Sequence, residues 1–167
     1  AYEVDCPGLP VPGKFVTSVS PADGAPKGMM VVYSGGSGGQ WWSEINTDMP
    51  ALIPRVNALG YTLVQVKWVS GVFTLGGYSG DYGPAKIMCR TATAVRFIHD
   101  YLYTPLHIPT AAAGTCGFCL SGNSGGSNQL GYMLSHYGLD GIIDAEVPSG
   151  GPPYSTLTKS SLRNPAD

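Results

Sequence analysis

Short apolar segments that resemble strands alternate along this chain with segments of helical spacing. Five segments have the length and side-chain character of strands: residues 13–20, 29–33, 61–68, 114–121 and 141–147. Residues 29–33, Met-Met-Val-Val-Tyr, are continuously apolar, as expected of a strand that is buried on both faces. The pattern therefore predicts a sheet with a buried centre.

Three segments have apolar residues three or four positions apart, which predicts helices at about 48–59, 85–103 and 125–137. Strands that alternate with helices are typical of a parallel sheet covered by helices. We therefore expect an α/β fold: a mostly parallel sheet with helices on both faces, in a single domain that spans residues 1–167.

Composition excludes several classes of protein. Hydrophobic residues make up 43% of the 167 residues, too many for a disordered chain. The net charge is only −2, so nucleic acid is not an expected partner. No apolar run approaches the ~18 residues of a membrane span.

The low charge, 12% of residues, the ten tyrosines and the four cysteines are typical of an exported protein. We therefore expect a secreted protein, either extracellular or periplasmic. Residues 1–6 contain no basic or apolar stretch of the signal-peptide kind, so we expect any such peptide to have been removed.

Candidate chemistry centres on residues 122–126, Gly-Asn-Ser-Gly-Gly, which match the G-x-S-x-G pattern. The pattern alone is weak in a chain with 24 glycines, and residues 35–39 match it too. Context separates the two matches. Ser124 lies directly between a predicted strand and a predicted helix, whereas the helix after Ser37 begins only near residue 48. The alternative for Ser124 is an ordinary Gly/Ser turn.

With these elements, nearly the whole chain resembles the first half of the α/β-hydrolase superfamily, the N-terminal, nucleophile-bearing portion of a secreted esterase-like serine hydrolase. The resemblance implies that Ser124 attacks a carboxylic ester and forms an acyl-enzyme. It also implies two oxyanion donors, the backbone N–H of Gly125 and that of Gly36 or Ser37. The alternative for the loop at 35–39 is a flexible turn. No cofactor and no metal are expected.

Residues 122–127 also resemble the G-D-S-G-G-P motif of chymotrypsin-like proteases. That fold is all-β, and the segment after its serine is a strand. Residues 127–134 have helical spacing here, which favours the α/β-hydrolase interpretation.

A catalytic serine needs a histidine base within hydrogen-bond reach. His136 follows Ser124 by twelve residues on the same predicted helix, roughly 18 Å away at ~1.5 Å per residue. His107 and His99 precede the strand that leads to Ser124, so we expect them at its opposite end. We expect all three histidines to be structural or exposed.

The acid is equally hard to place. Asp144 lies within a predicted strand, short of its carboxyl end at Pro148, and Asp81 comes before Ser124 in the chain. We therefore expect a companion segment, or a second chain from the same precursor, to supply the aspartate and the histidine. The competing hypothesis is a catalytically inactive, hydrolase-like binding module.

Four cysteines allow three pairings. Cys116 and Cys119 are three positions apart on a predicted strand and should point to opposite faces, so we expect no bond between them. We expect Cys89 to pair with Cys119 or Cys116, and Cys6 with the remaining cysteine or with the companion segment.

Aromatic residues follow two predicted strands: Trp41, Trp42, Phe73, Tyr78 and Tyr82. Loops at the carboxyl ends of parallel strands are where α/β proteins bind ligands. These residues are candidates to bind an apolar or aromatic acyl group, which leaves polyester and hydroxycinnamoyl esters open as substrates. The alternative is that they cover the edge of the sheet.

Overall fold

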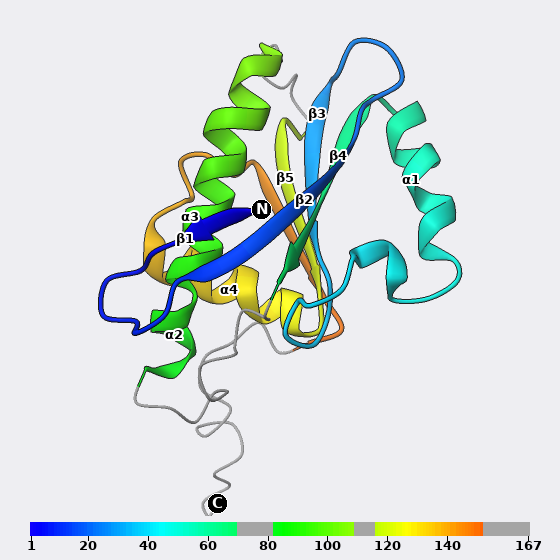
Figure 1. Cartoon of the computed structure of the whole chain (residues 1–167). Helices are drawn as coiled ribbons and strands as arrows, with labels where there is room; N and C mark the ends of the chain where they lie inside the picture. Colours follow the sequence, from blue (N-terminus) through cyan, green and yellow to red (C-terminus); the bar gives the residue numbers. More distant parts are fainter. Residues whose placement is uncertain (70–81, 109–115, 152–167) are drawn as a thin grey trace, which may run out of the picture.

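The computed structural model describes residues 1–69, 82–108 and 116–151. A six-stranded sheet in the order β1-β2-β4-β3-β5-β6 forms its centre (Figure 1). The strands are β1 (Tyr2–Val4), β2 (Gly13–Ser20), β3 (Gly28–Tyr33), β4 (Tyr61–Trp68), β5 (Phe118–Asn123) and β6 (Ala145–Ser149). Strands β4, β3, β5 and β6 are parallel, and β1 and β2 pair antiparallel at one edge.

Helices lie on both faces of the sheet (Figure 1). Helix α1 (Met49–Ala58) covers one face, and α2 (Gly83–Ile87), α3 (Cys89–Ile98) and α4 (Gly125–Tyr137) cover the other. The described residues also contain the helical turns η1 (Trp42–Glu44), η3 (His99–Tyr103) and η4 (Thr104–Leu106). Within the described ranges, no helix is both long enough and apolar enough to span a bilayer. The predicted α/β class, with a mostly parallel sheet, is confirmed.

The predicted and observed elements differ in informative places. The helix expected over 85–103 is divided: α2 ends at Ile87, α3 runs from Cys89 to Ile98, and the separate turn η3 covers His99–Tyr103. Strand β6 begins at Ala145 rather than Gly141, since the N–H of Ile142 donates to the carbonyl of Leu139 and forms a turn there. Strand β1 has only three residues and was not predicted.

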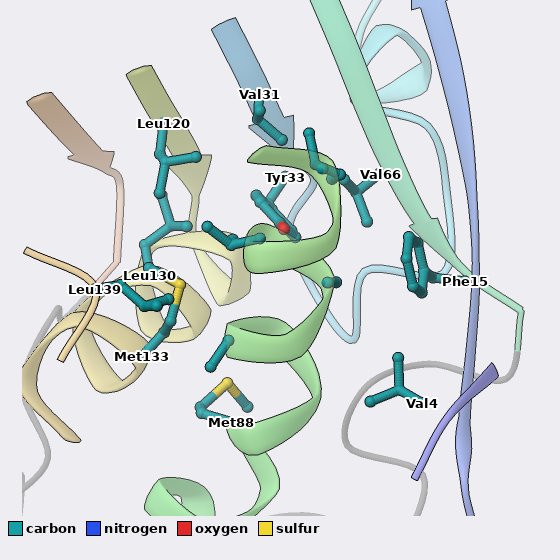
Figure 2. Close-up of a cluster of buried hydrophobic side chains, with 14 of the residues drawn as sticks. Val4, Phe15, Val31, Tyr33, Val66, Met88, Leu120, Leu130, Met133 and Leu139 are labelled. Atoms are coloured by element: carbon teal, nitrogen blue, oxygen red, sulfur yellow. The ribbon is translucent and has the colours of Figure 1, made fainter. Parts of the chain in front are cut away.

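The core between the sheet and helices α3 and α4 fixes the positions of the strand ends. Val31, Tyr33 and Leu120 of neighbouring strands belong to the same buried cluster as Leu130 and Met133 of α4, and Leu120 points toward these two residues (Figure 2). All five side chains are at most 1% exposed. Burying each of the four side chains other than Tyr33 contributes roughly 1.5–3 kcal/mol. Strands β3 and β5 and helix α4 therefore form one packed unit.

Two disulfides join the four cysteines, and the predicted pairing is wrong. Cys6 bonds Cys89, and Cys116 bonds Cys119. The two cysteines do not lie on alternating strand faces, because Cys116 precedes the first residue of β5, Phe118, and is not part of the strand. The Cys6–Cys89 bond ties the segment after β1 to the start of α3 across 83 residues.

Candidate functional site

Ser124 occupies the sharp turn between the end of β5, at Asn123, and the start of α4, at Gly125. Its backbone has φ 52° and ψ −112°, a left-handed conformation that costs a residue with a side chain about 1–3 kcal/mol. His107 is the only other non-glycine residue with positive φ in the described ranges. The Ser124 side chain is exposed. The fold therefore holds this serine at the surface in a strained turn.

Close approach of backbones explains the glycines on either side of Ser124. A Cβ at Gly122 would lie 2.5 Å from the carbonyl oxygen of Gly126, and a Cβ at Gly126 would lie 2.6 Å from that of Tyr33. The Ser124 N–H donates to the carbonyl of Ser149 at 2.7 Å. The turn is thus fixed by the ends of β3 and β6 as well as by its own strand and helix.

The loop after β3 lies directly against this turn. Its base is closed by Ser34, whose hydroxyl donates to the Gln40 carbonyl at 2.7 Å. A Cβ added to Gly125 would collide with the carbonyl oxygen of Gly36, and one added to Gly35 would lie 3.3 Å from the Ser124 Cβ. Only a chain without side chains at these positions can bring the loop and the helix start together.

A cleft of about 460 Å³ opens between the loop and the turn. It is lined by Gly35, Gly36, Ser37, Gly39, Gln40, Ile45, Asn123 and Ser124. The structure therefore brings Ser124 together with Gly36 and Ser37, and Gly125 is buried beside Gly36. Sequence reasoning missed Gln40 and Ile45, which carry no motif and enter the cleft only because the loop folds back at Ser34.

The aromatic candidates lie elsewhere or outside the described residues. Trp41 and Trp42 are half-buried and do not line the cleft, and the Lys67 Nζ lies 5.3 Å from the Trp41 ring centre. Tyr82 is half-buried and packs against the hydrophobic core. Tyr78, like Phe73, lies outside the described residues.

All three histidines of the chain are described, and each has local partners. The Nδ1 of His99 lies 2.8 Å from an Asp100 carboxylate oxygen, and its ring packs edge-on against Phe118, the first residue of β5. Because β5 runs about 3.3 Å per residue, His99 lies roughly 20 Å from the Ser124 end. His136 Nδ1 lies 3.1 Å from the Tyr132 carbonyl oxygen, near the far end of α4.

His107 Nδ1 lies 2.7 Å from the Pro105 carbonyl oxygen. Asp144 precedes β6 rather than lying inside a strand as predicted. Its carboxylate accepts hydrogen bonds from the N–H groups of Gly117 and Phe118, at 2.9 and 2.8 Å. Asp144 therefore caps the amino end of β5, opposite to Ser124. Asp81 lies outside the described residues.

Among residues 1–69, 82–108 and 116–151, no three His, Cys, Asp or Glu side chains gather in a way that could hold a metal ion. The chemistry that the described cleft can offer is that of a hydroxyl, carried by Ser124, beside backbone N–H groups. The first N–H groups of a helix have no partner within the helix, and such groups can bind an anion.

No protein-family model and no curated protein matches this chain. Solved structures are similar in fold. A thermostable carboxyl esterase from Bacillus coagulans is 13% identical, with a TM-score of 0.55, and the match covers 88% of this chain and 42% of the esterase. Est1E from Butyrivibrio proteoclasticus is 16% identical, with a TM-score of 0.58, over 95% of this chain and 53% of Est1E.

The structure of Est1E with ferulic acid bound is also similar, at 18% identity and a TM-score of 0.54, over 89% of this chain and 53% of that one. This chain therefore has the α/β-hydrolase fold. It spans about half the length of the solved structures that it matches.

Proposed function

We propose that this chain is the nucleophile-bearing portion of a carboxylic ester hydrolase, with Ser124 as the nucleophile. The observation that carries the proposal is the strained, exposed position of Ser124 beside a cleft and directly before a helix. Strain of this kind persists only where the surrounding structure enforces it, and it gathers at functional sites. An exposed serine in an ordinary turn would not be expected to have a strained backbone.

In the proposed reaction, the Ser124 Oγ bonds to the ester carbonyl carbon while a base takes the hydroxyl proton. The carbonyl oxygen becomes an oxyanion, which accepts hydrogen bonds from the Gly125 N–H and from the N–H of Gly36 or Ser37. The C–O bond to the alcohol then breaks, and the alcohol leaves with the proton. Water cleaves the acyl-enzyme in the same way and releases the acid.

The base and its acid partner come, in this proposal, from a companion segment or chain. Support comes from the histidines, none of which lies at the carboxyl end of β5. Strand β6 is the edge of the described sheet, and Val147 on it is 59% exposed. The buried Oε2 of Glu146 has no hydrogen-bond partner among the described residues, and burial raises the pKa of its carboxyl.

The proposed substrates are esters with an apolar or aromatic acyl group, such as hydroxycinnamoyl esters or polyesters. The similar fold of Est1E, which has been solved with ferulic acid bound, supports this choice. Ile45 supplies an apolar wall to the cleft. Secretion is part of the proposal because the two disulfides would persist in an oxidising compartment.

A second candidate function is a binding module without catalysis. The observation that favours it is that each of the three histidines has local partners and none of these partners is Ser124. Under this hypothesis the cleft holds a ligand, and Ser124 only contributes a hydrogen bond.

A fluorophosphonate probe distinguishes the two functions, because it reacts with an activated serine and not with an ordinary one. The natural protein, with any companion segment or chain present, should be labelled at Ser124, and the Ser124→Ala variant should not. Ser135→Ala is the matched control, since Ser135 is an exposed serine at the far end of the same helix. Absence of labelling in the natural protein would favour the binding module.

A further inference from the structure

We propose that Gln129 is a positioning residue that sets the spacing of the two oxyanion donors through Trp68. The inference rests on the proposed function and adds to it a residue that no motif indicates. The two donors come from different elements, since Gly125 begins α4 and Gly36 and Ser37 belong to the loop after β3. Some contact must therefore hold the loop and the helix in one arrangement.

Gln129 lies one helical turn after Gly125 and is completely buried. Its Oε1 accepts a hydrogen bond from the indole Nε1–H of Trp68 at 2.9 Å, and a second from the Thr91 hydroxyl at 3.3 Å. Its Nε2 is also buried and has no hydrogen-bond partner among the described residues, so both hydrogen bonds of this side chain are made by the Oε1. One side chain thus joins α4 to the end of β4 and to α3.

Trp68 carries this connection to the loop. It is the last residue of β4, and its backbone N–H donates to the carbonyl of Gly38 at 2.8 Å. A Cβ added to Gly38 would lie 2.7 Å from the indole Cδ1 of Trp68 and 3.0 Å from the Nε2 of Gln129. The Gln129–Trp68 pair therefore lies directly beneath Gly38, the residue next to Ser37.

The loop thus touches the helix at two levels. The first contact, next to the cleft, is between the Gly36 carbonyl and Gly125. The second, lower contact is between Gly38 and the side chains of Trp68 and Gln129, which are hydrogen-bonded to each other. One contact alone would allow the loop to pivot about it, whereas two contacts fix its orientation. Since an oxyanion needs both donors at about 3 Å from the position of its charge, the lower contact affects the transition state more than the binding of the substrate.

The test uses Gln129→Met, which keeps the size of the side chain and removes its acceptor, in the natural protein with its companion segment or chain. We expect kcat to fall by up to about 100-fold, the scale of a 1 Å misplacement, with KM nearly unchanged. Affinity for a trifluoromethyl ketone, whose serine adduct carries an oxyanion, should fall in parallel. Trp68→Phe should do the same, and the double variant should be no worse than either single one.

Asn57→Ala provides the matched control for lost stability. Asn57 is also a buried amide, and it donates to the carbonyls of Ser20 and Tyr61 at the other end of the sheet. It should lower Tm without changing kcat. If Gln129→Met behaves like Asn57→Ala, with kcat and ketone affinity unchanged, Gln129 is structural and the inference is wrong.

A measurement on the unaltered protein covers the case in which the variants do not fold. Binding of the ketone should shift the NMR signal of the Trp68 indole N–H and slow its hydrogen exchange, because the oxyanion tightens the loop. An unchanged signal would contradict the inference. Failure of the proposed function has a different signature, since the fluorophosphonate probe would then not label Ser124 at all.

Discussion

The two ends of strand β5 differ in backbone strain and in exposure to solvent. At the amino end, the Asp144 carboxylate satisfies the N–H groups of Gly117 and Phe118, and His99 packs on the Phe118 ring. At the carboxyl end, Ser124 is strained and exposed beside a cleft. Side-chain hydrogen bonds support both ends, since the Ser127 hydroxyl also donates to the carbonyls of Gly122 and Ser149. Only the second end depends in addition on close backbone contacts that glycine allows.

This difference separates a structural end from a candidate functional one. A group whose polar atoms are all satisfied locally has no capacity left for a substrate. The turn at Ser124, in contrast, needs the packed unit of β3, β5 and α4 to maintain its strain. We therefore expect changes at the carboxyl end to have the larger effect on chemistry, and changes at the amino end to affect only stability and titration.

The largest effect is expected from Gly126→Ala. The added Cβ would lie 2.6 Å from the Tyr33 carbonyl oxygen and 2.9 Å from that of Ser34, and both belong to backbone that cannot move aside. Overpacking of this kind destabilises a fold by about 3 kcal/mol. Urea unfolding of the variant should show this loss.

Gly141→Ala is the matched control for that substitution. A Cβ at Gly141 meets nothing within 4 Å, so the change should leave stability the same or raise it by about 0.4–1 kcal/mol. Equal losses at the two glycines would remove the distinction between the crowded turn and the rest of the surface.

Sequence reasoning predicted the elements around Ser124 well because their signals are local. The apolar stripe of Leu130 and Met133 and the glycine after Tyr137 define α4 as the structure has it, Gly125–Tyr137. The same reasoning began the last strand at residue 141, although β6 begins at Ala145. The turn before it depends on one backbone hydrogen bond, from Ile142 to Leu139, which no residue type indicates.

The rest of the site depends on contacts distant in sequence. Gln129 and Trp68 are 61 residues apart, and nothing near either residue indicates the other. The Cys116–Cys119 bond was missed for a different reason, since an error in the start of one strand reversed the geometric argument. Long-range contacts and element boundaries are therefore where sequence patterns carry least information.

An intermediate effect is expected from Ser124→Gly. Glycine adopts the φ of 52° without steric strain, so the variant should gain up to about 1 kcal/mol after its larger entropy in the unfolded state is counted. Ser124→Ala is the control, because alanine keeps the strain and should leave stability nearly unchanged. Both variants should lose fluorophosphonate labelling. A Ser124→Gly variant no more stable than Ser124→Ala would show that the turn is not strained.

The smallest effect belongs to the amino end, where Asp144→Asn should alter the titration of Tyr103. Burial, and secondarily the Asp144 charge, raise the pKa of the Tyr103 phenol above its ordinary value of 10.0. The folded state therefore favours the neutral phenol, and stability is lost as pH rises from 10 through the higher pKa of the folded state. Asparagine keeps an oxygen for the N–H groups of Gly117 and Phe118 but removes the charge.

The pKa of Tyr103 should consequently move down toward 10.0 in Asp144→Asn, and the alkaline loss of stability should become smaller. NMR titration of ¹³C-labelled tyrosine measures this, with Tyr103→Phe to assign the signal. Tyr137 is the internal control, since burial raises the pKa of its phenol without a contribution from Asp144. A shift of both tyrosines would mean that the substitution loosens the fold as a whole. A shift of Tyr103 alone, with unchanged fluorophosphonate labelling of Ser124, would show that the two ends of β5 are independent.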